Sequence, residues 1–240
     1  MLENPQSVTP LLWHLLTRLG EAQILLPLVG AATLWLWRSA AQGWLALRWL
    51  LAIGVVALAT TLSKLAFMGW GWGSAAWDFT GFSGHAMFAA ACLPMLGWVV
   101  GLGRGRGLHL LATGAGFALA ALVAYSRLVV QAHSPSEAAL GFALGGLASL
   151  WVLRAAPDLR LSLPLWLPAG LIACLLLLPV SLPRSRSHEL MAQLSLRLSG
   201  HQRVFTRQDL HRPRRLPLNA AALPSPAAPT TPPPWRPATR

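Results

Sequence analysis

The sequence predicts an all-α membrane protein, a polytopic bundle of about six transmembrane helices. Of its 240 residues, 55% are hydrophobic and 11% are charged, a balance far more apolar than that of soluble domains. The mean hydropathy is +0.52. The apolar residues are also gathered into runs close to the roughly 20 residues that a helix needs to cross a bilayer. These observations exclude an ordinary soluble domain.

Six apolar runs approach the length of a membrane span. The first is short, and residues 10–20 before it mix leucines with His14 and Arg18, which favours a helix lying in the membrane interface. Gly141 and Gly145 give the fifth run a face that allows close helix contact, so we expect the third to fifth helices to form a compact core. The runs are approximately Ala22–Trp37, Trp49–Phe67, His85–Leu102, Leu108–Tyr125, Pro135–Leu153 and Leu163–Leu182.

Tryptophans and arginines predict how the bundle lies in the membrane. Tryptophans cluster at both ends of the second run, as in the aromatic belts of membrane proteins. Arginines fall in alternate short loops, which the positive-inside rule assigns to the cytoplasm. The other two loops, residues 68–84 and 126–134, are then on the outer side. The loop arginines are Arg38, Arg104, Arg106, Arg154 and Arg160.

The chain divides into four predicted parts, and most of its charge lies in the last two. An interfacial segment (1–21) precedes the transmembrane domain (22–182), a basic amphipathic segment (183–210) and a disordered Pro/Ala-rich tail (211–240). Residues 184–240 hold ten arginines and two acids, which is +8 of the net charge of +12. This basic region either contacts anionic lipid headgroups or is simply solvated. No nucleic-acid-binding signature accompanies it, so we expect no nucleic-acid partner.

Two polar patches lie where apolar runs begin or end, on the same predicted face. They are Phe82-Ser83-Gly84-His85 and Ser126-Arg127, with His133 six residues after the second; Lys64, the only lysine, precedes both. Lysine and arginine neutralise phosphate oxygens, and free N–H groups at a helix start bind anions. Of two imidazoles, one can attack phosphorus while the other donates a proton. Taken singly, Lys64 and Arg127 have a plainer interpretation, in which each reaches the lipid headgroups.

These patches resemble two motifs of the type 2 phosphatidic acid phosphatase (PAP2) superfamily. Residues 82–85 resemble its PSGH motif and residues 126–137 its SRxxxxxHxxxD motif, within a catalytic core of about residues 64–153. The resemblance implies a membrane lipid-phosphate phosphatase of a bacterial inner membrane, acting through a phosphohistidine on the periplasmic face. It implies a membrane lipid phosphate, a phosphomonoester or pyrophosphate, as substrate and the lipid bilayer as surroundings, with no cofactor and no metal. The lipid and the oligomeric state stay open.

The resemblance also assigns roles to residues. His133 would be the nucleophile, His85 the acid that protonates the leaving oxygen, and Glu137 the carboxylate that holds His133. The phosphate would be held by Lys64, Ser83, Gly84, Ser126 and Arg127.

The chain departs from the family pattern at three positions. The first motif, KxxxxxxRP, is half present, because Gly71 stands where the arginine belongs; Glu137 replaces aspartate, and Phe82 replaces proline. One phosphate-binding cation is therefore missing or supplied from elsewhere. An alternative function follows, a non-catalytic lipid-phosphate binder or transporter with a degenerate site.

Other polar residues are predicted to lie outside the site. Asp78 could bind a substrate hydroxyl, orient His85 or pair with Lys64, but a solvated carboxylate or a turn cap with Thr80 is favoured. His109 falls at the opposite membrane face. Three further histidines show no metal-ligand spacing: His188, His201 and His211.

Overall fold

The protein is an all-α bundle, as the sequence predicts. The computed structural model describes residues 5–39, 42–156, 166–181, 183 and 187–211. Within that part of the chain the regular elements are helices, and the one β-type contact is an isolated bridge between Ser74 and Phe79. The helices are α1 (Pro5–Arg18), α2 (Ala22–Ser39), α3 (Gly43–Trp70), α4 (Gly84–Gly101), α5 (Arg106–Val129), α6 (Pro135–Leu153), α7 (Trp166–Ser181), α8 (Ser187–Ser199) and α9 (Arg207–His211).

By length and composition alone, fewer helices qualify as membrane spans than the six that the apolar runs predict. Among the described residues, α3, α4, α5 and α6 are long and apolar enough to cross a membrane. A fifth span results if α1 and α2, which meet at an angle of 43°, are one broken span. Helix α7 is apolar but shorter. The count of six therefore stays a prediction.

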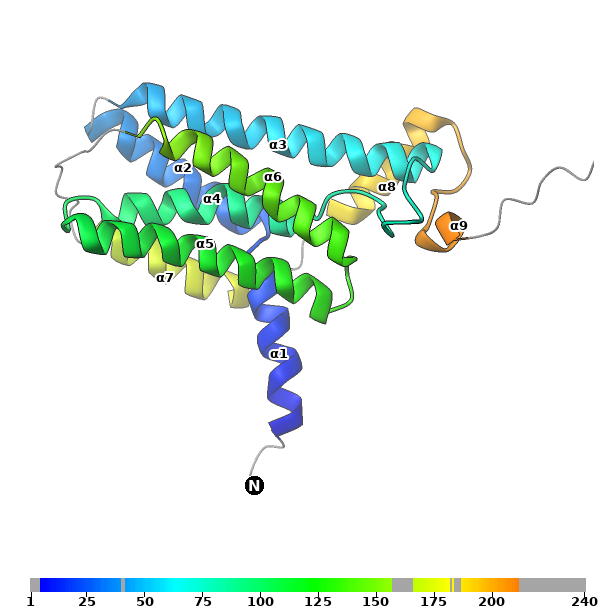
Figure 1. Ribbon diagram of the computed structural model, residues 1–240, viewed down its shortest axis with the longest axis horizontal. Helices are drawn as coiled ribbons and strands as arrows, with labels where there is room; N and C mark the ends of the chain where they lie inside the picture. The colour runs from blue at the N-terminus through cyan, green and yellow to red at the C-terminus, as the bar shows by residue number, and fades with distance from the viewer. Residues whose placement is uncertain (1–4, 40–41, 157–165, 182, 184–186, 212–240) are drawn as a thin grey trace, which may run out of the picture.

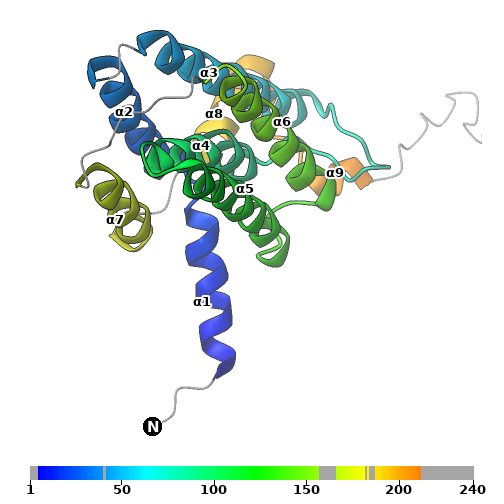
Figure 2. The ribbon, with the colours of Figure 1, turned by 60° about the vertical axis from the view of Figure 1, so that its left-hand side comes forward.

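Helix α4 is the centre of the bundle and packs most extensively against α5 and α6 (Figures 1 and 2). Of the residues in its span, 72% are buried, against 22–39% in the other three spans. Glycines make this packing close. A Cβ added at Gly145 would lie 2.1 Å from the carbonyl oxygen of Met87, and one at Gly141 would lie 2.6 Å from that of Ser83. The predicted small-residue face and helical core are confirmed.

The outer surface of the bundle is apolar, and tryptophans lie near both ends of α3. Trp37 and Trp44 are exposed near one end, and Trp70, Trp72 and Trp77 at the other. Between them, α3 exposes a row of leucines and a valine, as a lipid-facing helix does: Leu47, Leu50, Leu51, Val55, Leu58 and Leu62. The predicted clustering at both ends of this helix is confirmed.

The two loops that carry the polar patches lie at the same end of the bundle, the right-hand end in Figure 1. The C-terminal helices α8 and α9 lie there too, and α8 packs against α3. The segment 183–210, predicted to be basic and amphipathic, contains α8, and its contact with anionic lipid headgroups stays a prediction. Residues 212–240, where we predict a disordered tail, lie outside the described residues.

The break between α1 and α2 also reaches this end of the bundle. Gly20 lies in the break, and a Cβ added there would lie 2.6 Å from the carbonyl oxygen of His85 and 2.9 Å from its Cβ. Only a residue without a side chain permits this approach. The N-terminal part of the chain therefore packs directly on the first turn of α4, whether or not α1 lies in the membrane interface as predicted.

Candidate active site

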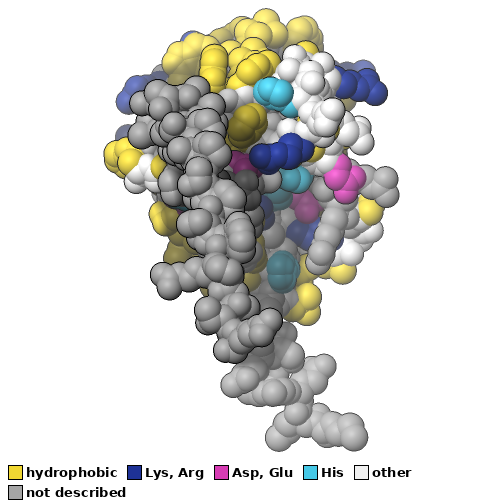
Figure 3. Space-filling view, turned by 90° about the vertical axis from the view of Figure 1, so that its right-hand side faces the viewer, with side chains coloured by type: hydrophobic (Ala, Val, Ile, Leu, Met, Phe, Trp, Pro, Cys, Tyr) yellow, Lys and Arg dark blue, Asp and Glu magenta, His cyan; other side chains and the backbone are white. Residues whose placement is uncertain are grey.

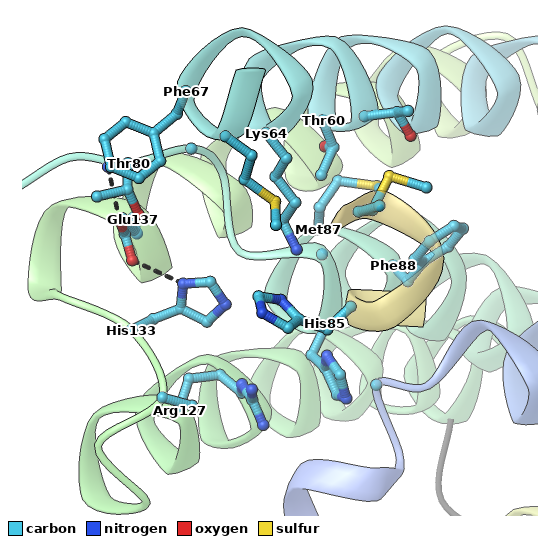
Figure 4. Close-up of a pocket in the computed structure, with 18 of the residues that line it drawn as sticks. Thr60, Lys64, Phe67, Thr80, His85, Met87, Phe88, Arg127, His133 and Glu137 are labelled. Atoms are coloured by element: carbon cyan, nitrogen blue, oxygen red, sulfur yellow. Dashed lines mark hydrogen bonds and ion pairs between the residues drawn. The ribbon is translucent and has the colours of Figure 1, made fainter. Parts of the chain in front are cut away.

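A cavity of about 630 Å³ opens at this end of the bundle. Figure 4 shows the side chains of Lys64, His85, Arg127 and His133 converging on it. They come from α3, α4, α5 and the α5–α6 loop, so the fold gathers groups that lie up to about 70 residues apart in the sequence. On the end face seen in Figure 3, histidines, cationic side chains and acids gather between apolar surfaces. The structure thus brings Gly84 and His85 of one patch beside Arg127 and His133 of the other.

The start of α6 fixes His133 and its carboxylate partner. The Ser134 side chain accepts a hydrogen bond from the Glu137 N–H, and the Glu137 carboxylate accepts one from the Ser134 N–H at 3.2 Å, which together form a capping box. Pro135 occupies the first turn, where its missing N–H costs nothing. This local sequence therefore starts the helix and sets Glu137 one turn beyond His133.

Glu137 is fully buried and is hydrogen-bonded through both carboxylate oxygens. Oε2 lies 2.7 Å from Nδ1 of His133, and Oε1 accepts the backbone N–H of Thr80 at 2.7 Å and the Thr80 hydroxyl. The glutamate therefore reaches the histidine that the family's aspartate is expected to hold. Because Nδ1 is engaged, Nε2 is the ring nitrogen of His133 left for chemistry.

The electrostatic surroundings of His133 favour its neutral form. Burial of the imidazole lowers its pKa below the ordinary value, and the charges of Lys64 and Arg127 lower it further. The hydrogen bond that His133 donates to Glu137 raises the pKa without cancelling the effect of burial. A neutral imidazole carries the lone pair that a nucleophile needs.

The two predicted cations lie on either side of the cavity. Nζ of Lys64 lies 3.7 Å from the position that a Cβ would take at Gly84, over the first residue of α4. Arg127 is held from the N-terminal part of the chain, because its Nη1 donates to Oγ1 of Thr17 at 2.6 Å. Lys64, Gly84 and Arg127 all line the cavity, and their role in holding phosphate stays a prediction.

The two predicted serines lie elsewhere. Ser126 is buried in the last turns of α5, where its hydroxyl donates to the carbonyl of Val123 at 2.6 Å, and it does not line the cavity. Its own helix satisfies the hydroxyl, as is common for serine. Ser83 is buried and does not line the cavity either, and its N–H donates to the carbonyl of Glu137 at 3.1 Å. Within the described part of the chain, its Oγ has no hydrogen-bond partner.

Asp78 does not cap Thr80, so that part of the favoured interpretation is wrong; its carboxylate is 41% exposed, as a solvated loop carboxylate would be, but it is also ion-paired. Its Oδ1 lies 2.7 Å from Nε2 of His211, and its Oδ2 accepts a hydrogen bond from Arg207. Thr80 instead directs its N–H and hydroxyl to Glu137. The partners of Asp78 come instead from the C-terminal segment, and no sequence pattern predicts that this segment lies beside the loop.

Sequence reasoning therefore missed the contribution of the C-terminal segment. Arg207 lines the cavity, and its Nη2 donates to Oε2 of Glu137 at 2.7 Å. His188 of α8 lines the cavity as well, and Nδ1 of His201 lies 2.8 Å from the carbonyl oxygen of Gly69. The only signal in the sequence was an excess of arginines and histidines after residue 183. His109 packs against Trp98, away from the cavity, as expected.

Among the described residues, no group of three or more histidine, cysteine, aspartate or glutamate side chains is arranged to hold a metal ion. The absence of a metal in the mechanism stays a prediction. The cavity is lined by side-chain cations, which can bind a phosphate.

Comparisons with known proteins match the motif regions of the chain. Residues 67–161 match the PAP2 superfamily. A protein of Klebsiella pneumoniae, described as "Uncharacterized 22.5 kDa protein in cps region", is 37% identical over 207 residues, which cover 83% of this chain and 98% of that protein. No solved structure matches the chain. With both histidine motifs brought into one cavity and Glu137 bonded to His133, the chain belongs to the PAP2 superfamily.

Proposed function

We propose that this protein is a membrane lipid-phosphate phosphatase that hydrolyses a phosphomonoester or pyrophosphate through a phosphohistidine. PAP2 proteins are generally phosphatases, so membership supports phosphoester hydrolysis as the class of reaction. One observation carries the finer proposal. His133, oriented by Glu137 at 2.7 Å, shares a cavity with a second histidine, His85, and with the cations Lys64 and Arg127.

The reaction has two steps. In the first, Nε2 of His133 attacks phosphorus, the bond from phosphorus to the lipid oxygen breaks, and His85 gives its proton to that oxygen. Lys64 and Arg127 stabilise the charge on the phosphoryl oxygens, and Glu137 stabilises the imidazolium. In the second, a water attacks the phosphohistidine and gives its proton to His85. The phosphorus–nitrogen bond breaks, and free phosphate leaves.

The walls of the cavity support a lipid as the substrate. Apolar side chains face the cavity beside the charged groups, among them Phe67, Met87 and Phe88 (Figure 4). The cavity lies at the end of the spans, where a lipid headgroup sits when its chains stay in the bilayer. Exposed Trp72 and Trp77 on the adjoining loop are suited to the membrane–water boundary.

The arginines of the short loops support a periplasmic site in a bacterial inner membrane. Arg38, Arg104, Arg106 and Arg154 lie at the ends of helices away from the cavity. The positive-inside rule assigns that side to the cytoplasm and the cavity to the outer face.

Hydrolysis of a lipid panel by purified protein tests the proposal. The panel contains phosphatidic acid, phosphatidylglycerophosphate, undecaprenyl pyrophosphate and lipid A, and phosphate release is measured in detergent micelles. We expect release from at least one lipid, its loss in His133→Ala, and its retention in His14→Ala, which alters an exposed histidine of α1. With substrate labelled at the phosphoryl group, wild-type protein should carry transient acid-labile label that His133→Ala lacks.

The same panel separates the alternative function. A non-catalytic binder or transporter would bind lipid phosphate in both the wild-type and His133→Ala proteins and release phosphate in neither. The observation behind this alternative is the glycine at position 71 in place of the family's arginine. The hydrogen bond between Glu137 and His133 argues against this alternative, because the glutamate that replaces the family's aspartate still contacts the proposed nucleophile.

A further inference from the structure

Position 71, where the family's first motif has an arginine, is unfavourable for such a side chain in this protein. Gly71 ends α3 in the left-handed conformation (φ 71°), which disfavours residues with a Cβ. A Cβ added there would also lie 3.0 Å from the ring of Phe205. The space beside this position is therefore taken by a residue more than a hundred positions later in the chain.

Phe205 belongs to a segment that lies along the end of α3, residues 200–211, here called the C-terminal strap. The Phe205 N–H donates to the carbonyl of Met68 at 2.9 Å, and His201 bonds the carbonyl of Gly69. Leu210 packs on Gly73, where an added Cβ would be 3.1 Å from its side chain. In Figure 1, α9 at the end of the strap lies beside the α3–α4 loop. These contacts fix the strap where the first motif should continue.

The strap brings a cation to the cavity two residues after Phe205. Arg207 is half-buried and lines the same cavity as Lys64 and Arg127. Its Nη2 donates to Oε2 of Glu137 at 2.7 Å, the same oxygen that lies 2.7 Å from Nδ1 of His133. Nη1 bonds the carboxylate of Asp78 and, at 3.2 Å, its carbonyl oxygen. A single carboxylate oxygen therefore separates this guanidinium from the proposed nucleophile.

We propose that Arg207 binds the substrate phosphate and supplies, from the strap, the cation that position 71 lacks. The inference rests on the proposed function for its setting. A guanidinium presents donors in a planar fork that can bind two phosphate oxygens at once. Asp78 and Glu137 hold this guanidinium at the cavity, and a phosphate on Nε2 of His133 would take the N–H groups of Arg207 that these two carboxylates leave. The strap is then part of the active site, and its removal should lower the activity of the enzyme.

Arg207 could instead act only through Glu137, and this second role would change the pH dependence of the reaction rather than phosphate binding. If the guanidinium acted only through Glu137, its removal would leave phosphate binding intact. It would then change the protonation of His133, because a positive charge near the ring disfavours the imidazolium. The acid limb of the pH–rate profile would move to higher pH. Phosphate affinity and pH profile must therefore be measured together.

The test compares Arg207→Ala and Arg207→Lys with Arg197→Ala, a matched control on an exposed arginine of α8 that does not line the cavity. Full-length proteins in detergent are assayed for kcat/KM on the hydrolysed lipid and for binding of inorganic phosphate by calorimetry. We expect Arg207→Ala to lose about 100-fold in kcat/KM, in the range for loss of one transition-state donor, and about tenfold or more in phosphate affinity. Arg207→Lys should fall between, and guanidinium ion at non-denaturing concentration should restore part of the Arg207→Ala activity.

The remaining outcomes either refute the role of Arg207 in phosphate binding or leave that role to be decided by a second measurement. If Arg207→Ala equals Arg197→Ala in both assays while wild-type protein hydrolyses lipid, the inference fails and the proposed function stands. A shifted acid limb with unchanged phosphate affinity also overturns it. If wild-type protein hydrolyses no lipid, the proposed function fails, and the phosphate titrations alone decide the role of Arg207. If Arg207→Ala does not fold, Arg207→Lys decides by the same criteria.

Discussion

Replacing Glu137 by aspartate, the residue usual in the family, should damage this enzyme. Aspartate is shorter by one methylene, about 1.5 Å of chain, so the 2.7 Å contact with Nδ1 of His133 would stretch toward about 4 Å, outside hydrogen-bond range. The loop cannot easily follow, because Thr80 and the capping box with Ser134 also depend on the full length of the glutamate. A hydrogen bond to a charged group contributes about 1.5–3 kcal/mol. Loss of the His133 bond alone then lowers kcat by about 10- to 150-fold.

The assay for Glu137→Asp is steady-state phosphate release in detergent micelles, with Glu189→Asp as control. Glu189 is an exposed residue of α8, and the same shortening there should leave kcat unchanged. Thermal unfolding in the same detergent separates lost chemistry from lost folding. If Glu137→Asp works as well as the wild-type protein or better, then the glutamate is not fitted to its surroundings, and the assignment of its bonds to catalysis is refuted.

Two further predictions concern protonation and packing. The kcat/KM profile should fall on the acid side only below about pH 6.5, the ordinary imidazole pKa, because burial and nearby cations lower the pKa of His133 and a protonated ring cannot attack. Lys64→Met removes one of those cations and should move this limb to higher pH; a wild-type limb above pH 6.5 would contradict the reasoning. Gly145→Ala should lower the detergent melting temperature, since its methyl group would meet the Met87 carbonyl at 2.1 Å and such overpacking costs about 1–3 kcal/mol or more. Gly54→Ala, with nothing within 4 Å of the added Cβ, should have no such effect.

The sequence predicted the bundle well where the signal was local. Apolar runs and their ends located α2 to α7, because span length and loop polarity are properties of contiguous residues. Gly141 and Gly145 identified a packing face for the same reason, since residues four apart share one side of a helix. His133 and Glu137 also lie four apart, and their contact follows from the start of α6 between them.

Residues whose neighbours depend on side-chain orientation were less predictable. Ser126 belongs to a recognisable motif, yet its hydroxyl turns back to Val123 of its own helix. Motif spacing gives the helix face only to within about one residue, while a hydrogen bond requires a particular rotamer. The prediction that Asp78 caps Thr80 was wrong for a related reason. Its partners Arg207 and His211 lie on a segment that no local signal connects to the loop.

The arginine-rich C-terminal region shows most clearly what cannot be predicted from sequence composition. Its charge was visible in the sequence, but composition does not distinguish one arginine of the strap from another. Arg203 lies four residues before Arg207, and it pairs with Asp209 on the exposed side. Arg207 instead reaches Glu137, 70 residues earlier in the chain, because Phe205 is anchored on Met68 beside a glycine cap. A departure from a motif is therefore weak evidence of lost function until the space around the missing side chain is known, because another part of the fold can fill that space and bring in the same chemical group.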